Sequence, residues 1–405
     1  MWFLNLSSQE SIKAKKVLFI IVDGIAADML KSNATPHLDA IALDGGYTEA
    51  YVGGMKNGYS QTPTISAVGY NSLLTGVWAN KHNVWGNEIK DPNYNYPTIF
   101  RIYKDQFPEA KTAIFSTWLD NRTKLVGDEL PQTKHLKIDY AFDGFELDTT
   151  QFPHDLKREY IKNIDAHVAK EASRYIKTEA PDLSWVYLEY SDDMGHGYGD
   201  SPQLSAAIQF EDSLIGSIYE AVKYRENNHN EEWLFLVTTD HGRSASDGKG
   251  HGGQSDRERS TWIVTNSTET NAYFKNQIPA IVDLLPTMTD FLKLNVPQEI
   301  QAEWDGVSLL RPVDFTDVTA EIKNDELQVS WKNLSNTENP IRVFTSTTNA
   351  IKNGGTDIYS EVGTTPAGEE HFSLNLKNKT DRPIKILLRS PHTTRNVWLT
   401  YPDTN

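Results

Sequence analysis

Carboxylate and imidazole side chains follow three apolar segments of this chain, and this pattern constrains the fold more than any other feature. Residues 17–22, 185–190 and 234–239 are each typical of a short strand, and one further histidine stands between glycines in residues 250–253. In an open α/β sheet the carboxyl ends of the strands line one crevice, so side chains that follow different strands converge there. We expect six residues to lie where strands end: Asp23, Asp192, His196, Asp240, His241 and His251.

Three aspartates and three histidines form a ligand set that suits a pair of divalent metal ions. Carboxylates and imidazoles are shared ligands of zinc and of other borderline divalent metals. Each member taken alone has an ordinary structural explanation, because an Asp–Gly pair after a strand is usually a turn. The ordered set of six favours two metal ions, with zinc as the first choice and manganese as the second.

The stretch from residue 61 to residue 87 places one hydroxyl group at a regular spacing from two other motifs. Ser66 lies nine residues before Thr75, which opens a Thr–Gly pair, and Asn87 lies twenty-one residues after Ser66. Together with the ordered ligand pattern, this spacing resembles the alkaline phosphatase superfamily. The resemblance is to the compact bacterial form of its type I phosphodiesterase/nucleotide pyrophosphatase branch, and it spans roughly residues 15–312.

The resemblance implies an α/β fold, an alkaline phosphatase-like sandwich with a central, mostly parallel sheet. It implies that Ser66 is the nucleophile and that Asn87 binds a phosphoryl oxygen. The implied ligands of the metal ion that activates the nucleophile are Asp23, Asp240 and His241. The implied ligands of the ion that faces the leaving group or the attacking water are Asp192, His196 and His251. Ser66 departs from the branch, which usually has threonine at this position, and His251 follows the Asp–His pair closely, as in the compact members.

A serine hydroxyl needs an adjacent base or a metal ion to become a good nucleophile at neutral pH. No His–Asp pair flanks Ser66 in the sequence, so a metal ion and a phosphoseryl intermediate are expected. The Asn87 amide and the backbone N–H after the nucleophile are expected to stabilise the phosphoryl oxygens, aided by a helix N-terminus if Ser66 begins one. Rival hydroxyls, which we expect in turns and caps, belong to Ser60, Thr62, Thr64 and Ser72, with Thr64 the strongest rival.

The substrate class is less constrained than the chemistry. A phosphodiesterase is favoured, and an alkaline phosphomonoesterase is the alternative, which would need an extra cation for the third unesterified oxygen. Arg122, which follows the predicted strand 111–118, is the candidate for that cation. A sulfatase is disfavoured because Tyr70 stands where the sulfatase motif has arginine. A metal-dependent binding protein without catalysis is the remaining alternative, and His37 and His82 are expected to be structural.

The net charge of the chain limits the kinds of partner that we expect. With 39 basic and 55 acidic residues in 405, the net charge of −16 argues against a nonspecific grip on nucleic acid, so a small phosphate ester is the expected partner. No apolar run is long enough to span a bilayer. The absence of cysteine excludes a thiol nucleophile and thiolate zinc sites. Residues 1–10 do not resemble a signal peptide, yet the resemblance favours the periplasm or the cell exterior, and the oligomeric state stays open.

Two domains are expected. Residues 1–312 would form the metallohydrolase domain, with an insertion at about residues 88–180 that faces the substrate. Residues 313–405 would form a small β-sandwich similar to a fibronectin type III module, in a structural or glycan-contacting role. Short alternating runs support this second domain, at residues 318–322, 326–331, 341–344, 372–376 and 384–388.

Overall fold

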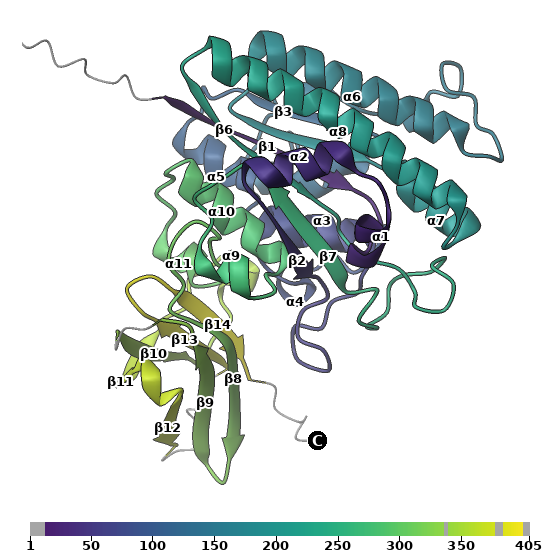
Figure 1. Cartoon of the computed structure of the whole chain (residues 1–405). Helices are drawn as coiled ribbons and strands as arrows, with labels where there is room; N and C mark the ends of the chain where they lie inside the picture. The colour runs from purple at the N-terminus through teal and green to yellow at the C-terminus, as the bar shows by residue number, and fades with distance from the viewer. Residues whose placement is uncertain (1–12, 336–338, 377–383, 400–405) are drawn as a thin grey trace, which may run out of the picture.

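The computed structural model describes residues 13–335, 339–376 and 384–399, and its main feature is a seven-stranded sheet (Figure 1). The order across the sheet is β2-β7-β6-β1-β5-β3-β4. Neighbours from β6 to β4 are parallel, whereas β7 runs antiparallel to both β6 and β2. The strands are β1 (Ala14–Val22), β2 (Gly46–Tyr51), β3 (Thr112–Ser116), β4 (Tyr140–Phe142), β5 (Leu183–Leu188), β6 (Glu231–Thr238) and β7 (Ser260–Thr265).

Helices cover both faces of this sheet, so its central strands are apolar on both sides. In β1, Val17, Phe19 and Ile21 belong to one core and the residues between them to the other. This two-sided burial explains why the strand is a continuous apolar run. The first core includes α3 (Ser66–Thr75), α5 (Ile99–Gln106) and α10 (Leu284–Phe291). The second includes α1 (Ala27–Ser32), α2 (Pro36–Asp44), α6 (Glu159–Glu179) and α8 (Pro202–Asn228), of which α6 and α8 lie side by side in Figure 1.

Four further α-helices lie in the described part of the chain before residue 314. They are α4 (Ala79–His82), α7 (Tyr190–Tyr198), α9 (Ala272–Asn276) and α11 (Gln298–Gln301). No helix in the described ranges is long and apolar enough to cross a membrane.

After residue 314 the chain forms two small antiparallel sheets, drawn at the lower left of Figure 1. Their orders are β11-β10-β13-β14 and β12-β9-β8. The strands are β8 (Phe315–Lys323), β9 (Glu326–Asn333), β10 (Pro340–Ser346), β11 (Ser360–Pro366), β12 (His371–Asn375), β13 (Lys385–Arg389) and β14 (Thr394–Trp398). Apolar residues from both sheets, among them Trp331 and Val343, share one core.

Buried ion pairs join these sheets to the rest of the molecule. Lys81 in α4 donates to Asp305 Oδ1 at 2.6 Å and to Asn396 Oδ1 in β14 at 2.8 Å. Lys385 in β13 donates to Glu303 Oε1 at 2.8 Å. Both lysine side chains are fully buried, so the junction is a packed interface.

The predicted fold class is confirmed: a mixed α/β domain with a large, mostly parallel sheet is followed by small antiparallel sheets. All five predicted C-terminal runs lie in or at the edge of strands. The likeness to a fibronectin type III module and the boundary at 312/313 stay predictions. The N-terminal segment 1–10 lies outside the described residues.

Candidate metal centre

Two of the ligand groups follow adjacent parallel strands. β1 and β6 are neighbours in the sheet, with Ile21 paired with Thr238. Asp23 follows β1 directly, and Asp240 and His241 follow β6 after a single threonine. Because parallel strands end at the same edge of the sheet, the three side chains meet there.

The first ligand set, Asp23, Asp240 and His241, is fully buried. His241 Nε2 lies 3.2 Å from Asp23 Oδ1 and 3.3 Å from Asp240 Oδ2. These two oxygens are buried and accept no hydrogen bond in the described structure. Burial, with the charge of Asp23 adding to it, raises the pKa of Asp240 well above its usual value. Unpaired buried carboxylates are costly unless a cation neutralises them, so these residues fit a bound divalent ion.

Two tyrosines that the sequence did not identify as contacts of the metal centre hold the other oxygen of Asp23. Tyr187 OH donates to Asp23 Oδ2 at 2.7 Å, and Tyr70 OH donates to the same atom. These bonds leave Oδ1 free to face the ion. Tyr70, at the position that argued against a sulfatase, therefore supports a metal ligand.

Backbone groups orient the other two ligands of the first set. Gly24 N donates to Asp240 Oδ1 at 3.1 Å. His241 Nδ1 lies 2.9 Å from the carbonyl oxygen of Gly242, so Nδ1 carries the proton. The lone pair of Nε2 is then directed at the two carboxylates, as a metal ligand requires.

The second ligand set is more open to solvent. Asp192 and His196 lie one turn apart on α7 and share a helix face, while His251 comes from the loop between β6 and β7. His196 Nε2 lies 3.3 Å from Asp192 Oδ2 and 3.1 Å from His251 Nε2. His251 Nδ1 lies 2.9 Å from the carbonyl oxygen of Thr64, which orients the ring. The His196 side chain is 48% exposed.

The expectation that every ligand lies at a strand end is wrong for His196 and His251. The chain turns into α7 directly after β5, and the helical i,i+4 spacing brings His196 beside Asp192. His251 lies in the middle of a long loop that folds back against Thr64. A loop held by tertiary contacts has no periodic signal in the sequence.

Ser66 is the first residue of α3 and lies beside the first ligand set, with Oγ 3.3 Å from His241 Nε2. Gly69 permits this approach, because a Cβ at Gly69 would lie 2.7 Å from the carbonyl oxygen of Asp240. The helix therefore packs closely against the loop that carries Asp240 and His241. The N-terminus of α3 lies at the serine, as anticipated for an anion site.

The rival hydroxyls have structural partners. Thr64 Oγ1 donates to Gly253 O at 3.0 Å and accepts from Gly252 N at 2.9 Å, which ties the His251 loop to the segment before α3. The hydroxyls that bond within or next to their own segment are those of Ser60, Thr62 and Ser72. In the part of the chain that the structure describes, Ser66 is the member of this group whose hydroxyl contacts a candidate ligand.

Asn87 is exposed and reaches the start of α3, where its Oδ1 accepts from Ala67 N at 3.0 Å. This bond places the side-chain amide next to Ser66 and leaves its N–H groups available to a ligand. It also occupies the backbone N–H after the nucleophile, which we expected to serve as a separate donor. Asn87 thus takes over the position of that donor.

Arg122, the predicted substrate-binding arginine, is paired with two carboxylates. It lies in a single π-helical turn, Asn121–Val126, after β3. Its Nε donates to Asp143 Oδ2 at 2.6 Å and its Nη1 to Asp128 Oδ2 at 2.5 Å. The bonds to Asp143 raise the pKa of the guanidinium group further above its usual value. Carboxylates therefore hold Arg122 within the insertion, and its role in substrate binding stays a prediction.

Two histidines behave as expected. His82 is fully buried, with Nε2 3.1 Å from Ser72 Oγ and with Nδ1 accepting from Val84 N at 3.1 Å. His37 packs its ring against Gly216. Neither belongs to a ligand set in the described residues.

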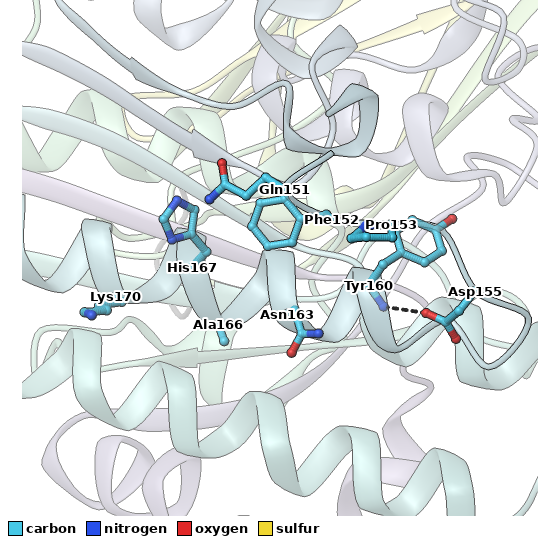
Figure 2. Close-up of a pocket in the computed structure, with 9 residues that line it drawn as sticks. All are labelled: Gln151, Phe152, Pro153, Asp155, Tyr160, Asn163, Ala166, His167 and Lys170. Atoms are coloured by element: carbon cyan, nitrogen blue, oxygen red, sulfur yellow. Dashed lines mark hydrogen bonds between the residues drawn. The ribbon is translucent and has the colours of Figure 1, made fainter. Parts of the chain in front are cut away.

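The insertion carries a pocket of about 470 Å³ along the first turns of α6 (Figure 2). Asp155 Oδ2 accepts from Tyr160 N at 3.0 Å and so fixes the start of the helix, as the dashed line in Figure 2 shows. Nearby, Arg158 Nε lies 3.8 Å from Asp193 Oδ1 on α7. The insertion therefore contacts the helix that carries part of the second ligand set. The pocket is lined by aromatic and polar groups that include Phe152, Tyr160, Asn163, His167 and Lys170.

The sequence and the fold of this chain are similar to those of known proteins. A model of the type I phosphodiesterase/nucleotide pyrophosphatase family matches residues 17–331. The chain belongs to this family. The family comprises metal-dependent phosphoric ester hydrolases, and the two ligand sets are its candidate metal-binding groups in this chain.

Similar proteins extend this result. Human ectonucleotide pyrophosphatase/phosphodiesterase family member 5 is 27% identical over 249 residues, which are 59% of this chain and 47% of that protein. The chain spans about half the length of the curated relatives it matches. Phosphonate monoester hydrolase of Agrobacterium radiobacter covers 95% of this chain and 88% of its own, with a TM-score of 0.52 and 15% identity. Murine ectonucleotide pyrophosphatase/phosphodiesterase 5, an inactive variant in complex with AMP, covers 70% and 96%, with a TM-score of 0.50 and 15% identity. At such identities these two structures show a shared fold.

Proposed function

We propose that the chain hydrolyses small phosphate esters, with a preference for diesters and nucleotide pyrophosphates, through a phosphoseryl intermediate at Ser66 and with two divalent metal ions. The observation that carries the proposal is the position of the Ser66 hydroxyl, 3.3 Å from His241 of the first ligand set. The second set lies next to it, because His251 and His241 stack with ring centroids 3.7 Å apart.

The residues of the site have separate roles in the reaction. Ser66 Oγ loses its proton to solvent and attacks phosphorus, and the bond to the leaving oxygen breaks, which releases an alcohol from a diester or a phosphate or nucleotide from a pyrophosphate. Water then attacks phosphorus and breaks the bond to Ser66 Oγ, which regains a proton. The free N–H groups of the Asn87 amide donate to a nonbridging oxygen. Divalent ions in the two sets would stabilise negative charge on the nucleophile and on the leaving oxygen. Zinc is the first candidate for both positions because each set combines carboxylate and imidazole ligands.

The preference for diesters rests on the contacts of Arg122. A phosphomonoester brings one more charged oxygen, which needs a cation beyond the metal ions. Arg122, the residue considered for that role, is bound by Asp128 and Asp143. A monoester oxygen left unpaired in a buried site costs roughly 1 to 3 kcal/mol. Diesters should therefore have the higher kcat/KM.

The test compares p-nitrophenyl phosphate, bis-p-nitrophenyl phosphate and the p-nitrophenyl ester of thymidine monophosphate after zinc reconstitution. We expect the two diesters to lead by at least about tenfold in kcat/KM, which corresponds to about 1.4 kcal/mol. The matched control is Arg122→Ala, which should change the diester-to-monoester ratio by less than about threefold because the group does not reach the substrate. A monoester preference that collapses in Arg122→Ala would show that this arginine moves into the site.

A further inference from the structure

Arg243 lies behind the second ligand set, two residues after His241, and its side chain is fully buried. Its Nη2 donates to Asp192 Oδ1 and, at 2.9 Å, to the carbonyl oxygen of Asp192. Its Nε donates to Gly24 O at 3.0 Å. The guanidinium group is thus fixed on the only carboxylate of the second set.

The chain makes room for this arginine at two glycines. A Cβ at Gly195 would lie 2.3 Å from the central carbon of the guanidinium group, and a Cβ at Gly24 would lie 2.5 Å from Nη2. Both glycines are next to metal ligands in the sequence, Asp23 and His196. Any side chain at either position would displace the guanidinium group, so the contact between Arg243 and Asp192 is built into the backbone.

The two ligand sets therefore differ in charge as well as in burial. The first set holds two carboxylates, Asp23 and Asp240, whose inner oxygens have no hydrogen-bond donor among the described residues. The second set holds one carboxylate, and the charge of Arg243 cancels it. At the first position a divalent ion meets two ligand carboxylates that have no guanidinium or ammonium partner among the described residues, and at the second it meets one that Arg243 already pairs.

We propose that the two positions load unequally: the first set holds its ion tightly, whereas the second set holds an exchangeable ion because Arg243 neutralises Asp192. This inference rests on the proposed two-metal function and adds a regulatory property to it. At limiting zinc, one ion per chain would be bound at the first set, and the enzyme would be inactive until a second ion binds. The concentration of free metal would then set activity through the second position.

Removal of Arg243 can change the metal affinity of the second set in either direction. A hydrogen bond that only orients a metal ligand strengthens binding, and its removal typically weakens metal affinity by about 10- to 100-fold. A cation that competes with the metal for the same carboxylate weakens binding, and its removal strengthens it. The sign of the change in affinity decides between the two.

The experiment is calorimetric titration of Zn²⁺ into the metal-free full chain, with the bound metal counted by mass spectrometry. Wild type should show two steps whose Kd values differ by at least about 100-fold. In Arg243→Met the weaker step should tighten by at least about tenfold while the tighter step changes by less than about threefold. Arg243→Lys keeps the charge and should stay near wild type. His196→Ala should remove the weaker step alone, which assigns it to the second set.

Two equal steps in wild type, or a weaker second step in Arg243→Met, would overturn the inference and leave the proposed function intact. Uptake of a single zinc ion at every concentration would instead refute the two-metal function itself. Circular dichroism checks each variant for folding. Arg243→Gln, read by the same criteria, replaces Arg243→Met if that variant does not fold.

Discussion

Two regions of the molecule bury several charged side chains, and the regions differ in whether each carboxylate has a lysine partner. At the junction with the C-terminal sheets, Lys81 pairs with Asp305 at 2.6 Å and Lys385 pairs with Glu303 at 2.8 Å. At the metal centre, the inner oxygens of the Asp23 and Asp240 carboxylates are as deeply buried but accept no hydrogen bond among the described residues. A buried carboxylate paired with a lysine supports the fold, whereas buried carboxylates without a lysine or arginine indicate that a ligand supplies the missing charge.

This contrast predicts opposite consequences of substitution. Changes at the metal centre should abolish turnover and leave the unliganded fold as stable as before, or more stable. Changes at the junction should lower stability and leave turnover in the folded fraction nearly unchanged. The C-terminal sheets would then have a structural role, since the pairs that bind them are buried.

The largest expected effect belongs to Ser66→Ala. Loss of the nucleophile should lower kcat/KM for bis-p-nitrophenyl phosphate by more than about 10³-fold, while the zinc content stays unchanged because every ligand remains. Ser66→Thr is the matched control, since it keeps the hydroxyl and should retain measurable turnover. If most activity survives in Ser66→Ala, Thr64 and not Ser66 would be assigned as the nucleophile.

The next effect concerns the junction. Lys81→Met leaves Asp305 buried without its cation and should lower the free energy of unfolding by about 3 to 5 kcal/mol. Urea unfolding measures the loss, and kcat of the folded protein should stay within about threefold. Lys31→Met removes a lysine from an exposed pair with Glu49 and should cost less than about 1 kcal/mol. Equal losses of unfolding free energy in the two variants would mean that the buried junction pair stabilises the fold no more than the exposed pair.

Asp240→Asn tests the other half of the contrast. The pKa of Asp240 is raised in the fold, so its ionisation destabilises the metal-free protein as the pH rises above the usual range of a carboxyl group. In a chelator at pH 7, the variant should therefore be more stable than wild type, by about 1 to 3 kcal/mol. With zinc the order should reverse, because wild type binds the ion more tightly. If the variant is less stable than wild type in chelator, the ionised Asp240 carboxylate does not destabilise the metal-free fold.

A further effect, spread over a range of pH, comes from His82. Burial lowers its pKa to about 3, so the folded chain keeps the ring neutral while the unfolded chain takes up a proton below about pH 6.5. The contribution of His82 to stability is present above pH 6.5 and is lost as the pH falls towards 3, by about 1.4 kcal/mol per pH unit. His82→Asn does not titrate, and Asn can still accept from Val84 N. The difference in unfolding free energy between wild type and this variant should shrink as the pH is lowered, and a constant difference would contradict the burial argument.

The sequence predicts features that depend on local spacing and misses those that depend on distant contacts. Alternating apolar residues predict strands such as β9 and β13, but β11 (Ser360–Pro366) lacks an apolar face and is defined by its pairing with β10. The sequence does not predict β14 because its Arg395 and Asn396 are polar, although at the junction Arg395 is half-buried and Asn396 is buried.

The site shows the same division. Asp23, Asp240 and His241 follow apolar strands, so their convergence could be predicted. The spacing between Ser66 and Asn87 likewise indicated that Asn87 lies near the start of α3, where it bonds to Ala67 N. The carboxylates that hold Arg122 are 6 and 21 residues away, and only folding brings them to it. Arg243 gave one signal, its place directly after the Asp–His–Gly motif, but its partner Asp192 lies 51 residues earlier.

The most direct test of the central claim is acid quenching of the zinc-loaded enzyme during turnover of bis-p-nitrophenyl phosphate, followed by peptide mass spectrometry. We expect a p-nitrophenylphosphoryl group on Ser66 in wild type and no modified peptide in Ser66→Ala. Full turnover with no modified serine, or a modification on Thr64, would contradict it.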